Sequence, residues 1–499
     1  QIKRSLLTVG AILSLFLIAK PLNVAADDSN TTIEVADYKT DTNTDMEAVN
    51  DALSVAKEQA KEAAATGNST QIIVHLAAGN YYMKDNEGIV LPSGVSLSCD
   101  VGTNIYAADS AKVDLITGTD ISNSSIYGGT FYWASNDKDK VKYGVKLTNA
   151  TNVNISGVTI DGNNKLTAAV KIDSSSNINL SNNTFTKADQ AGIMACNDGL
   201  ITLTGNTVSD ISQRGLKFND CTDIELGQDN IVTHNGLFGI ACYSSTIKMS
   251  DNNNLVSENY RHGILLDHSI GTLSHVSIYH NGYNDGYQGA SHGVCLTNGS
   301  SLTMDQCTVM YNGHNGISLS GGKSQICSAV IRNSTISNNG MGNYQGRQVY
   351  TEDGCGHGIC VSKASTAEIS NCNICNNTVC GISVSNKGNA VIHDNTISQN
   401  GRHGIGLSMA AVIEAYQNTI EYNHYNGILL SYGSYGNIYD NHSISYNGTV
   451  GNDIGGIGIS VSSSSAANIN RNFISYNIHT GVVVVGGSEW SEYVNALDS

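Results

Sequence analysis

The sequence predicts an all-β solenoid that is closed at its N-terminal end by one amphipathic helix. A short unit containing glycine and aliphatic residues recurs, mostly every 23 to 25 residues, over the last two thirds of the chain. Charged residues make up only 14% of the 499 residues, and 52 glycines but 2 prolines are present, a composition that suits tight turns better than long helices. The length alone would suggest about three domains. A repeat of this period instead predicts stacked units that share one core.

The first 26 residues have the order of a secretory signal. Lys3 and Arg4 precede an apolar run over 6–19, and Ala25 and Ala26 follow it. The run is shorter than the roughly 20 residues of a membrane span, although a retained anchor is the alternative interpretation. We therefore expect a bacterial protein that is secreted, extracellular or at the cell surface, with no membrane span in the mature chain.

The charge argues against nucleic acid as a partner. The chain has a formal net charge of −17, and removal of 1–26 would make the charge more negative because this segment contains three basic residues. Such an acidic chain repels nucleic acid and anionic membranes at long range. We expect a polysaccharide as the ligand or substrate, no nucleic acid, and a monomer.

One helix is predicted, over residues 44–67. Thr44 and Glu47 have the spacing of a capping box, and Gly67 is a plausible stop. A single apolar stripe follows from Met46, Val49, Leu53, Ala56, Ala60 and Ala63. Residues 71–79 and 88–99 then read as strands. We assign 27–142 to this cap helix and the first β-coils.

The repeat domain is assigned to 143–485, and 486–499 to a tail or partial cap. Each unit starts at a position that is usually glycine, here called the glycine slot. The residues one and three positions later are apolar. The slots are 144, 169, 192, 215, 239, 263, 293, 316, 358, 381, 404, 427, 456 and 481. The steps 263–293, 316–358 and 427–456 are longer, so three insertions should emerge from the same edge. The largest, 338–356, could form the wall of a groove for sugars.

These GI-x-L and N-x-I-x-x-N units resemble the repeats of right-handed parallel β-helices in the pectate-lyase-like superfamily. The resemblance covers about residues 32–485 and implies a single-stranded right-handed parallel β-helix of about 14 coils. That superfamily includes lyases, hydrolases, epimerases, esterases and adhesins, so the fold does not select a function. No family motif is matched residue by residue.

Stacking turns equivalent positions into columns about 4.8 Å apart. The residues two and four after each slot should point outward. The first of these columns carries Lys146, Lys171 and Lys217, and the second carries Tyr243 and Asp267. From residue 297 to residue 460 the second column contains only Thr and Ser. Reactive side chains therefore concentrate in the earlier units.

A further column, directly before the glycine slot, contains four of the 14 histidines: His262, His292, His357 and His403. Asparagine takes the same position in two other units. Two interpretations stay open. The imidazoles either form hydrogen bonds with the backbone at a coil corner, as asparagine does, or line a groove.

The densest group of reactive residues surrounds Asp267. The predicted catalytic residues are Asp267, His268, His262, Lys217 and Arg261. The predicted substrate-binding residues are Lys146, Lys171, Arg214, Tyr243, His292 and His357. β-Elimination on an acidic sugar needs this set, because a cation neutralises the uronate carboxylate, a base removes the neighbouring proton and an acid protonates the leaving oxygen.

We therefore expect a polysaccharide lyase or C5-epimerase that acts on an acidic glycan. One alternative is a non-catalytic glycan-binding or adhesin-like surface β-helix. Another is an inverting, polygalacturonase-like hydrolase, for which Asp220 and Asp267 stand about 9.6 Å apart by stacking, which is marginal. Calcium is the one cofactor that the resemblance suggests, and no metal ligands are assigned.

The 12 cysteines offer few disulfides. Cys295 and Cys360 share a column but stand two coils apart, which exceeds disulfide reach. Cys355 and Cys380 are the best-placed pair. Buried thiols, or zinc at Cys372 and Cys375, are the alternatives.

Overall fold

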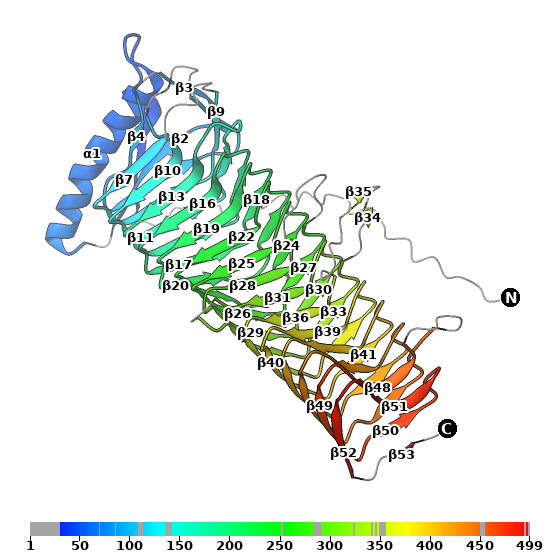
Figure 1. Ribbon diagram of the computed structural model, residues 1–499. Coiled ribbons are helices and arrows are strands. Elements are labelled where there is room, and N and C mark those ends of the chain that lie inside the picture. Colours follow the sequence, from blue (N-terminus) through cyan, green and yellow to red (C-terminus); the bar gives the residue numbers. More distant parts are fainter. Residues whose placement is uncertain are drawn as a thin grey trace.

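The computed structural model describes residues 30–68, 70–84, 86–107, 111, 113–134, 142–250, 253–282, 291–322, 325–340, 343–344, 347–348, 356–449, 455–493 and 496–497. The expected signal segment, 1–26, lies outside these residues. Within them the chain winds into one elongated solenoid of three long parallel sheets, here called A, B and C (Figure 1). This confirms the predicted all-β parallel solenoid.

Each coil contributes one strand to sheet C, then one to sheet A, then one to sheet B. Sheet C carries the candidate site. Its strands are β4 (Ile89–Val90), β7 (Ile116–Thr119), β10 (Tyr143–Thr148), β13 (Ala168–Asp173), β16 (Ala191–Cys196), β19 (Arg214–Asn219), β22 (Ile240–Tyr243), β25 (Ile264–Asp267), β28 (Val294–Thr297), β31 (Ile317–Ser320), β36 (Ile359–Ser362), β39 (Ile382–Ser385), β42 (Ile405–Ser408), β45 (Ile428–Leu430), β48 (Ile457–Val461) and β51 (Thr480–Val484).

Sheet A starts before the helix and runs the whole length of the solenoid. Its strands are β1 (Asn30–Glu34), β2 (Gln71–Leu76), β5 (Val95–Cys99), β8 (Ser122–Tyr127), β11 (Thr151–Ser156), β14 (Ser176–Ser181), β17 (Leu200–Thr204), β20 (Asp223–Leu226), β23 (Thr246–Met249), β26 (Ile270–Ser274), β29 (Ser301–Asp305), β32 (Ser328–Arg332), β37 (Thr366–Ser370), β40 (Asn389–His393), β43 (Val412–Tyr416), β46 (Tyr435–Tyr439), β49 (Ala466–Asn470) and β52 (Glu489–Tyr493).

Sheet B closes each coil before the chain returns to sheet C. Its strands are β3 (Gly79–Met83), β6 (Thr103–Ala107), β9 (Thr130–Trp133), β12 (Thr159–Asp161), β15 (Thr184–Thr186), β18 (Thr207–Ser209), β21 (Ile231–Thr233), β24 (Leu255–Ser257), β27 (Ser277–Tyr279), β30 (Thr308–Met310), β33 (Thr335–Ser337), β38 (Asn373–Cys375), β41 (Thr396–Ser398), β44 (Thr419–Glu421), β47 (Ser443–Ser445), β50 (Phe473–Ser475) and β53 (Ala496–Leu497). Pairing in sheets A and B therefore continues past residue 485.

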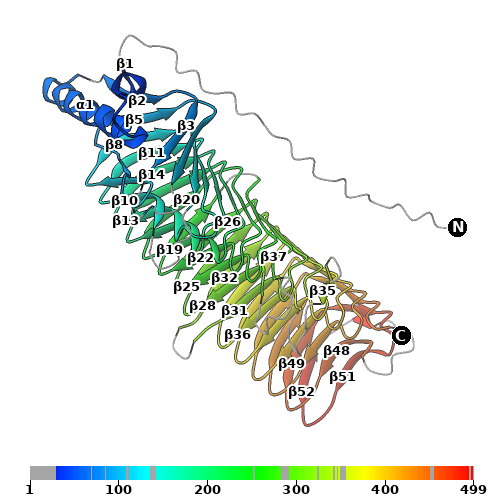
Figure 2. The same cartoon turned by 90° about the horizontal axis from the view of Figure 1, so that it is seen from above.

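The predicted helix is confirmed as α1 (Asp45–Thr66), which covers the N-terminal end of the solenoid (Figure 2). Thr44 and Glu47 form the capping box, with the Glu47 N–H donating to Thr44 Oγ1 over 3.1 Å and the Thr44 N–H donating to the Glu47 carboxylate over 2.7 Å. Gly67 ends the helix at φ +66°. The short 3-10 helix η1 (Val35–Tyr38) precedes α1. No helix in the described part of the chain is long and apolar enough to cross a membrane.

The predicted inward columns of sheet C form the core. In β25, for example, Ile264 and Leu266 are fully buried and pair with Val294 and Leu296 of β28. The glycine slot is a point of close backbone approach. A Cβ on Gly263 would lie 2.7 Å from the Gly293 carbonyl oxygen, so any larger residue would push the coils apart.

One predicted slot is wrong. Ile428 pairs with Ile459, so the glycine equivalent to Gly427 is Gly458 and not Gly456. The insertion before β48 is therefore two residues longer than predicted. The prediction was wrong because GGIGI contains more than one glycine that fits the local motif. With this correction, every strand of sheet C except β4 and β7 carries one predicted repeat unit.

The recurring asparagines form buried amide ladders at the coil corners. Asn312, for instance, accepts hydrogen bonds from the N–H and the side-chain amide of Asn281, both over 3.1 Å. Its own amide donates to Asn339 Oδ1 over 3.0 Å and to the Ile278 carbonyl over 3.2 Å. This ladder, in the turn from sheet B to sheet C, consists of Asn235, Asn259, Asn281, Asn312, Asn339, Asn377, Asn400, Asn423, Asn447 and Asn477. Each coil is thereby tied to the next.

Most of the extra length of the three longer steps lies in the connection from sheet B to sheet C, as predicted. The step 316–358 also has a longer turn from sheet C to sheet A, between β31 and β32. Part of the largest forms the antiparallel hairpin β34 (Asn343–Tyr344) and β35 (Arg347–Gln348). The groove wall predicted for 338–356 falls mostly outside the described residues.

Candidate functional site

The outer face of sheet C brings the predicted lysine column together. Lys146 pairs in register with Lys171, and Met194 separates Lys171 from Lys217. Lys146 Nζ lies 4.0 Å from Asp114, and Lys171 Nζ lies 3.9 Å from Asp173. These two lysines therefore have carboxylate neighbours.

Lys217 differs from the other two lysines. Among the described residues it has no carboxylate within ion-pair distance, and its side chain is partly buried. Burial lowers the pKa of Lys217, and the positive charges of Arg214 and Lys171 lower it further. Desolvation next to other cations favours the neutral amine, which is the form that can accept a proton.

Arg214 is the second cation without a carboxylate partner in the described part of the chain. Its Nη1 donates to Gln213 Oε1 over 2.9 Å, while its Nε is buried and has no hydrogen-bond acceptor. Because Nε is buried, only the terminal amino groups of this guanidinium could bind a carboxylate from outside the protein.

An aromatic ring connects Arg214 with Arg261. The guanidinium carbons of the two arginines lie 5.7 Å and 5.2 Å from the centroid of the Phe238 ring. Lys171, Arg214, Lys217 and Arg261 are called the cationic cluster below. It lies toward the edge of sheet C where the chain arrives from sheet B.

The predicted histidine column is a hydrogen-bonding ladder. His262 Nδ1 accepts the N–H of His292 over 2.9 Å, and His292 Nδ1 accepts the N–H of Asn315 over 3.3 Å. His357 and His403 accept in the same way from the next coil, over 3.2 Å and 3.3 Å. Asparagine takes the same role at Asn315, whose Oδ1 accepts the N–H of His357 over 2.9 Å. These imidazoles connect neighbouring coils, as the first of the two interpretations predicted.

The ladder geometry requires neutral rings. The rings of Phe238, His262 and His292 stack at centroid distances of 5.3 Å and 5.2 Å. Burial lowers the pKa of His262 to about 3, with Arg261 as the next cause, and lowers that of His403 to about 4. Because Nδ1 accepts a backbone N–H, the proton of each neutral ring is on Nε2.

The residues predicted around Asp267 do not converge. Arg261 and His262 precede β25, whereas Asp267 ends it and His268 follows it. The strand separates the pairs, since a strand rises about 3.3 Å per residue. Asp267 accepts a hydrogen bond from Asn298 over 2.8 Å, and exposed His268 lies 3.0 Å from the Gln325 amide. These contacts lie at the end of sheet C from which the chain turns toward sheet A.

Tyr243 lies at the same end of sheet C as Asp267. It ends β22, pairs in register with Asn219 and Asp267, and is half-buried. Its strand is the neighbour of β19, which carries Lys217.

Two residues of this face were not predicted. Phe238 stands in the same column as His262, directly before a glycine slot, so the sequence pattern could have identified it as part of this face. Asp114 precedes the first predicted repeat unit, so it could not be assigned to a column from the sequence. It accepts the Tyr143 N–H over 2.9 Å, and burial raises its pKa.

The described residues contain no group of three or more His, Cys, Asp or Glu side chains that could bind a metal ion. Cys380 is a free thiol, and its predicted partner Cys355 lies outside the described residues. Cys242 is fully buried in the core.

Comparison with known proteins gives one matching family, described as "Right handed beta helix region", over residues 82–281, 262–444 and 357–496. No curated protein sequence matches the chain. The chain is similar in structure to the Dettilon tailspike protein, with a TM-score of 0.52 and 15% identity over 69% of this chain and 67% of the tailspike.

Two other solved structures are more distant. A mannuronan C-5 epimerase module of Azotobacter vinelandii has a TM-score of 0.39 and 17% identity, over 93% of this chain and all of the module. Tailspike protein 2 of the Escherichia coli O157:H7 bacteriophage CAB120 has a TM-score of 0.46 and 13% identity, over 65% of this chain and 45% of that protein. At these identities the likenesses concern the fold alone.

Proposed function

Because the chain belongs to the family of right-handed β-helix regions, we propose that it is an exported carbohydrate-active protein whose cationic cluster binds an acidic glycan. The observation that carries the proposal is the pair Arg214 and Lys217. In a chain with a net charge of −17, two neighbouring cations lack a carboxylate partner among the described residues. A uronate carboxylate would supply the missing anion.

The finer proposal is a polysaccharide lyase or a C5-epimerase. Arg214 would pair with the uronate carboxylate and so acidify the C5–H bond. The unprotonated fraction of Lys217 would take that proton, since burial and the neighbouring cations lower its pKa. In a lyase the electron pair forms the C4–C5 double bond while the C4–O4 bond breaks, and the Tyr243 hydroxyl protonates the leaving oxygen. In an epimerase the proton returns to C5 from the opposite face.

Calcium would act through the glycan in this proposal. The protein and a polyuronate are both anionic, so a divalent cation between their carboxylates would reduce the repulsion.

The direct test is turnover on pectate, alginate and glycosaminoglycans, with and without calcium. Lyase activity gives absorbance from the unsaturated uronate, and epimerase activity gives exchange of the C5 proton with deuterated solvent. We expect Lys217→Ala to lower kcat by about 100-fold or more and Arg214→Ala chiefly to raise KM. Lys248→Ala is the matched control, because Lys248 lies on sheet A, 3.6 Å from Glu225. Full activity in both Lys217→Ala and Arg214→Ala would contradict the proposed site.

Binding without chemistry is the second candidate. It is favoured by the histidine ladder, which uses Nδ1 of each ring for the backbone, and by the plain serine column from Ser320 to Ser431. Wild-type protein that binds an acidic glycan, loses binding in Arg214→Ala and forms no product would support it.

A further inference from the structure

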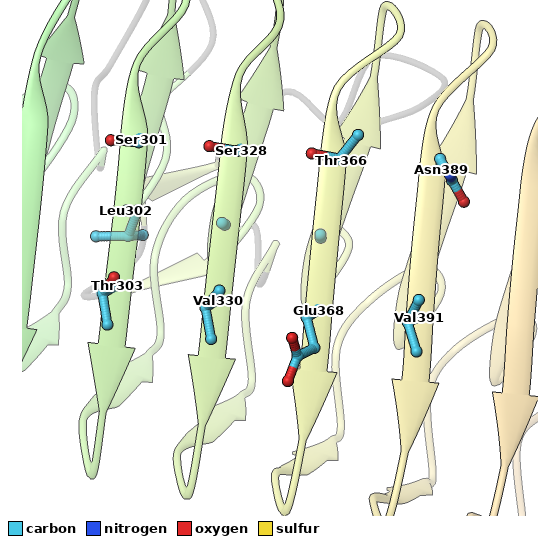
Figure 3. Close-up of a pocket in the computed structure, with 11 residues that line it drawn as sticks. Ser301, Leu302, Thr303, Ser328, Val330, Thr366, Glu368, Asn389 and Val391 are labelled. Atoms are coloured by element: carbon cyan, nitrogen blue, oxygen red, sulfur yellow. The ribbon is translucent and has the colours of Figure 1, made fainter.

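A hollow of about 340 Å³ lies on the outer face of sheet A, well away from the cationic cluster. Four successive strands, β29, β32, β37 and β40, form its floor, and their outward side chains stand in two rows (Figure 3). Its volume is within the range of small-ligand sites. These residues are called the sheet A hollow.

The first row supplies hydrogen-bonding groups. It consists of Ser301, Ser328, Thr366 and Asn389, which pair in register from one strand to the next. Neighbours in the row are therefore about 4.8 Å apart. This spacing is close to the length of one sugar unit in an extended glycan, so a chain along the solenoid axis would meet a hydroxyl or amide at each coil.

The second row supplies an apolar surface with one carboxylate. Val330 and Val391 flank Glu368 on neighbouring strands, and both valines are half-buried. Valine methyl groups can pack against the C–H face of a pyranose ring.

The hollow is close to neutral. Glu368 is the only lining residue with a formal charge, and Arg332 donates to its carboxylate over 2.8 Å. No lysine or arginine is among the lining residues, and the adjacent Arg332 is already paired with Glu368, so an acidic sugar would find no unpaired counter-charge here. The face also offers no free backbone donors for a peptide, because its strands pair on both sides.

We propose that the sheet A hollow binds an uncharged stretch of glycan chain, at a site separate from the cationic cluster. The site does not depend on the proposed function. Ser301, Ser328, Thr366 and Asn389 would hydrogen-bond the sugar hydroxyls, and Val330 and Val391 would contact a ring face.

The test is native affinity electrophoresis of the full chain in gels with and without soluble neutral polymers: hydroxyethylcellulose, mixed-linkage β-glucan, arabinoxylan, galactomannan and dextran. We expect at least one polymer to retard the wild type. Val391→Lys and Thr366→Lys should each weaken that retardation by tenfold or more, because the long charged chain would fill the hollow. Two variants are used so that misfolding of one leaves the test intact.

Thr202→Lys is the matched control. Thr202 stands in the same row as Val391 but lies outside the hollow, and native Lys248 shows that this row accommodates lysine. Arg214→Ala separates this site from the proposed function, and both it and Thr202→Lys should keep the retardation. Absence of retardation with all five polymers, or full retardation of folded Val391→Lys and Thr366→Lys, would overturn the proposal.

Discussion

At the scale of single residues, hydrogen-bond partners separate structural side chains from candidate functional ones. His262 accepts a backbone N–H from the next coil, as Asn315 does at its own position. Arg214 and Lys217 have no comparable partner in the described residues. The histidines are therefore explained by coil stacking, whereas these two cations are not.

His262→Asn should preserve the fold at neutral pH and make it less sensitive to acid. The pKa of His262 is lowered to about 3, below its unfolded value of about 6.5, so the unfolded chain binds more protons between these values. The wild type should lose stability as pH falls from 7 to 4, on the order of 3 kcal/mol for this group. Asparagine keeps the acceptor without titrating. Urea unfolding of the wild type and the variant at pH 7 and pH 4 measures the free energy of unfolding of each protein at each pH.

The same variant also tests chemistry at His262. Unchanged turnover at neutral pH would assign the imidazole to the ladder alone, and lost turnover with unchanged unfolding at pH 7 would assign it a role with substrate. An equal loss of stability by variant and wild type on acidification would contradict the ladder account.

At the scale of elements, the corners of the coils matter as much as the strands. Parallel strand pairing satisfies the backbone along each sheet, but a turn between sheets leaves polar groups inside the solenoid. The asparagine ladders satisfy these groups with side-chain amides one coil apart. The N-x-I-x-x-N repeat is therefore a consequence of corner geometry.

Asn312→Ala should destabilise the protein by about 2–4 kcal/mol, because it leaves the donors of Asn281, the Ile278 carbonyl and Asn339 Oδ1 short of partners inside the core. Asn179→Ala is the control. Its amide makes one exposed-face contact, to Asn154 over 3.3 Å, so the expected cost is below about 0.5 kcal/mol. Chemical denaturation compares the two. Similar losses in both variants would refute the role of the buried ladder.

At the scale of the whole molecule, the net charge and the cationic cluster act in opposite directions. The net charge of −17 repels an acidic glycan at long range, while Arg214 and Lys217 attract it at contact. Salt screens exposed, distant charges more than partly buried ones.

Association with an acidic glycan should therefore become faster as salt rises from about 0.01 M to about 0.1 M, where the Debye length falls from about 30 Å to about 10 Å. Stopped-flow measurements with oligogalacturonate of defined length give the rate constants. A neutral oligosaccharide of equal length should show no salt effect. Slower association at higher salt would mean that local attraction, and not overall charge, governs the encounter.

Much of the fold could be predicted because each coil repeats the same local demands. Glycine is required where Gly263 meets the carbonyl of Gly293, and aliphatic residues are required at the inward positions. The predicted register was wrong at Gly456, because an insertion precedes a motif with two candidate glycines. Local sequence does not specify which of them meets the next coil.

Periodicity within one coil was enough to predict the solenoid, the capping helix, the facing of the columns and the edge from which most of the inserted length emerges. Which reactive residues meet depends instead on contacts between coils. The tertiary structure separated Arg261 from Asp267 across β25, engaged the histidines with the next coil, and left Arg214 and Lys217 without carboxylates among the described residues. It also formed the sheet A hollow from side chains 23 to 38 residues apart, one coil to the next. The physical reason is that contacts in a parallel solenoid run between coils, and turn lengths set which residues become neighbours.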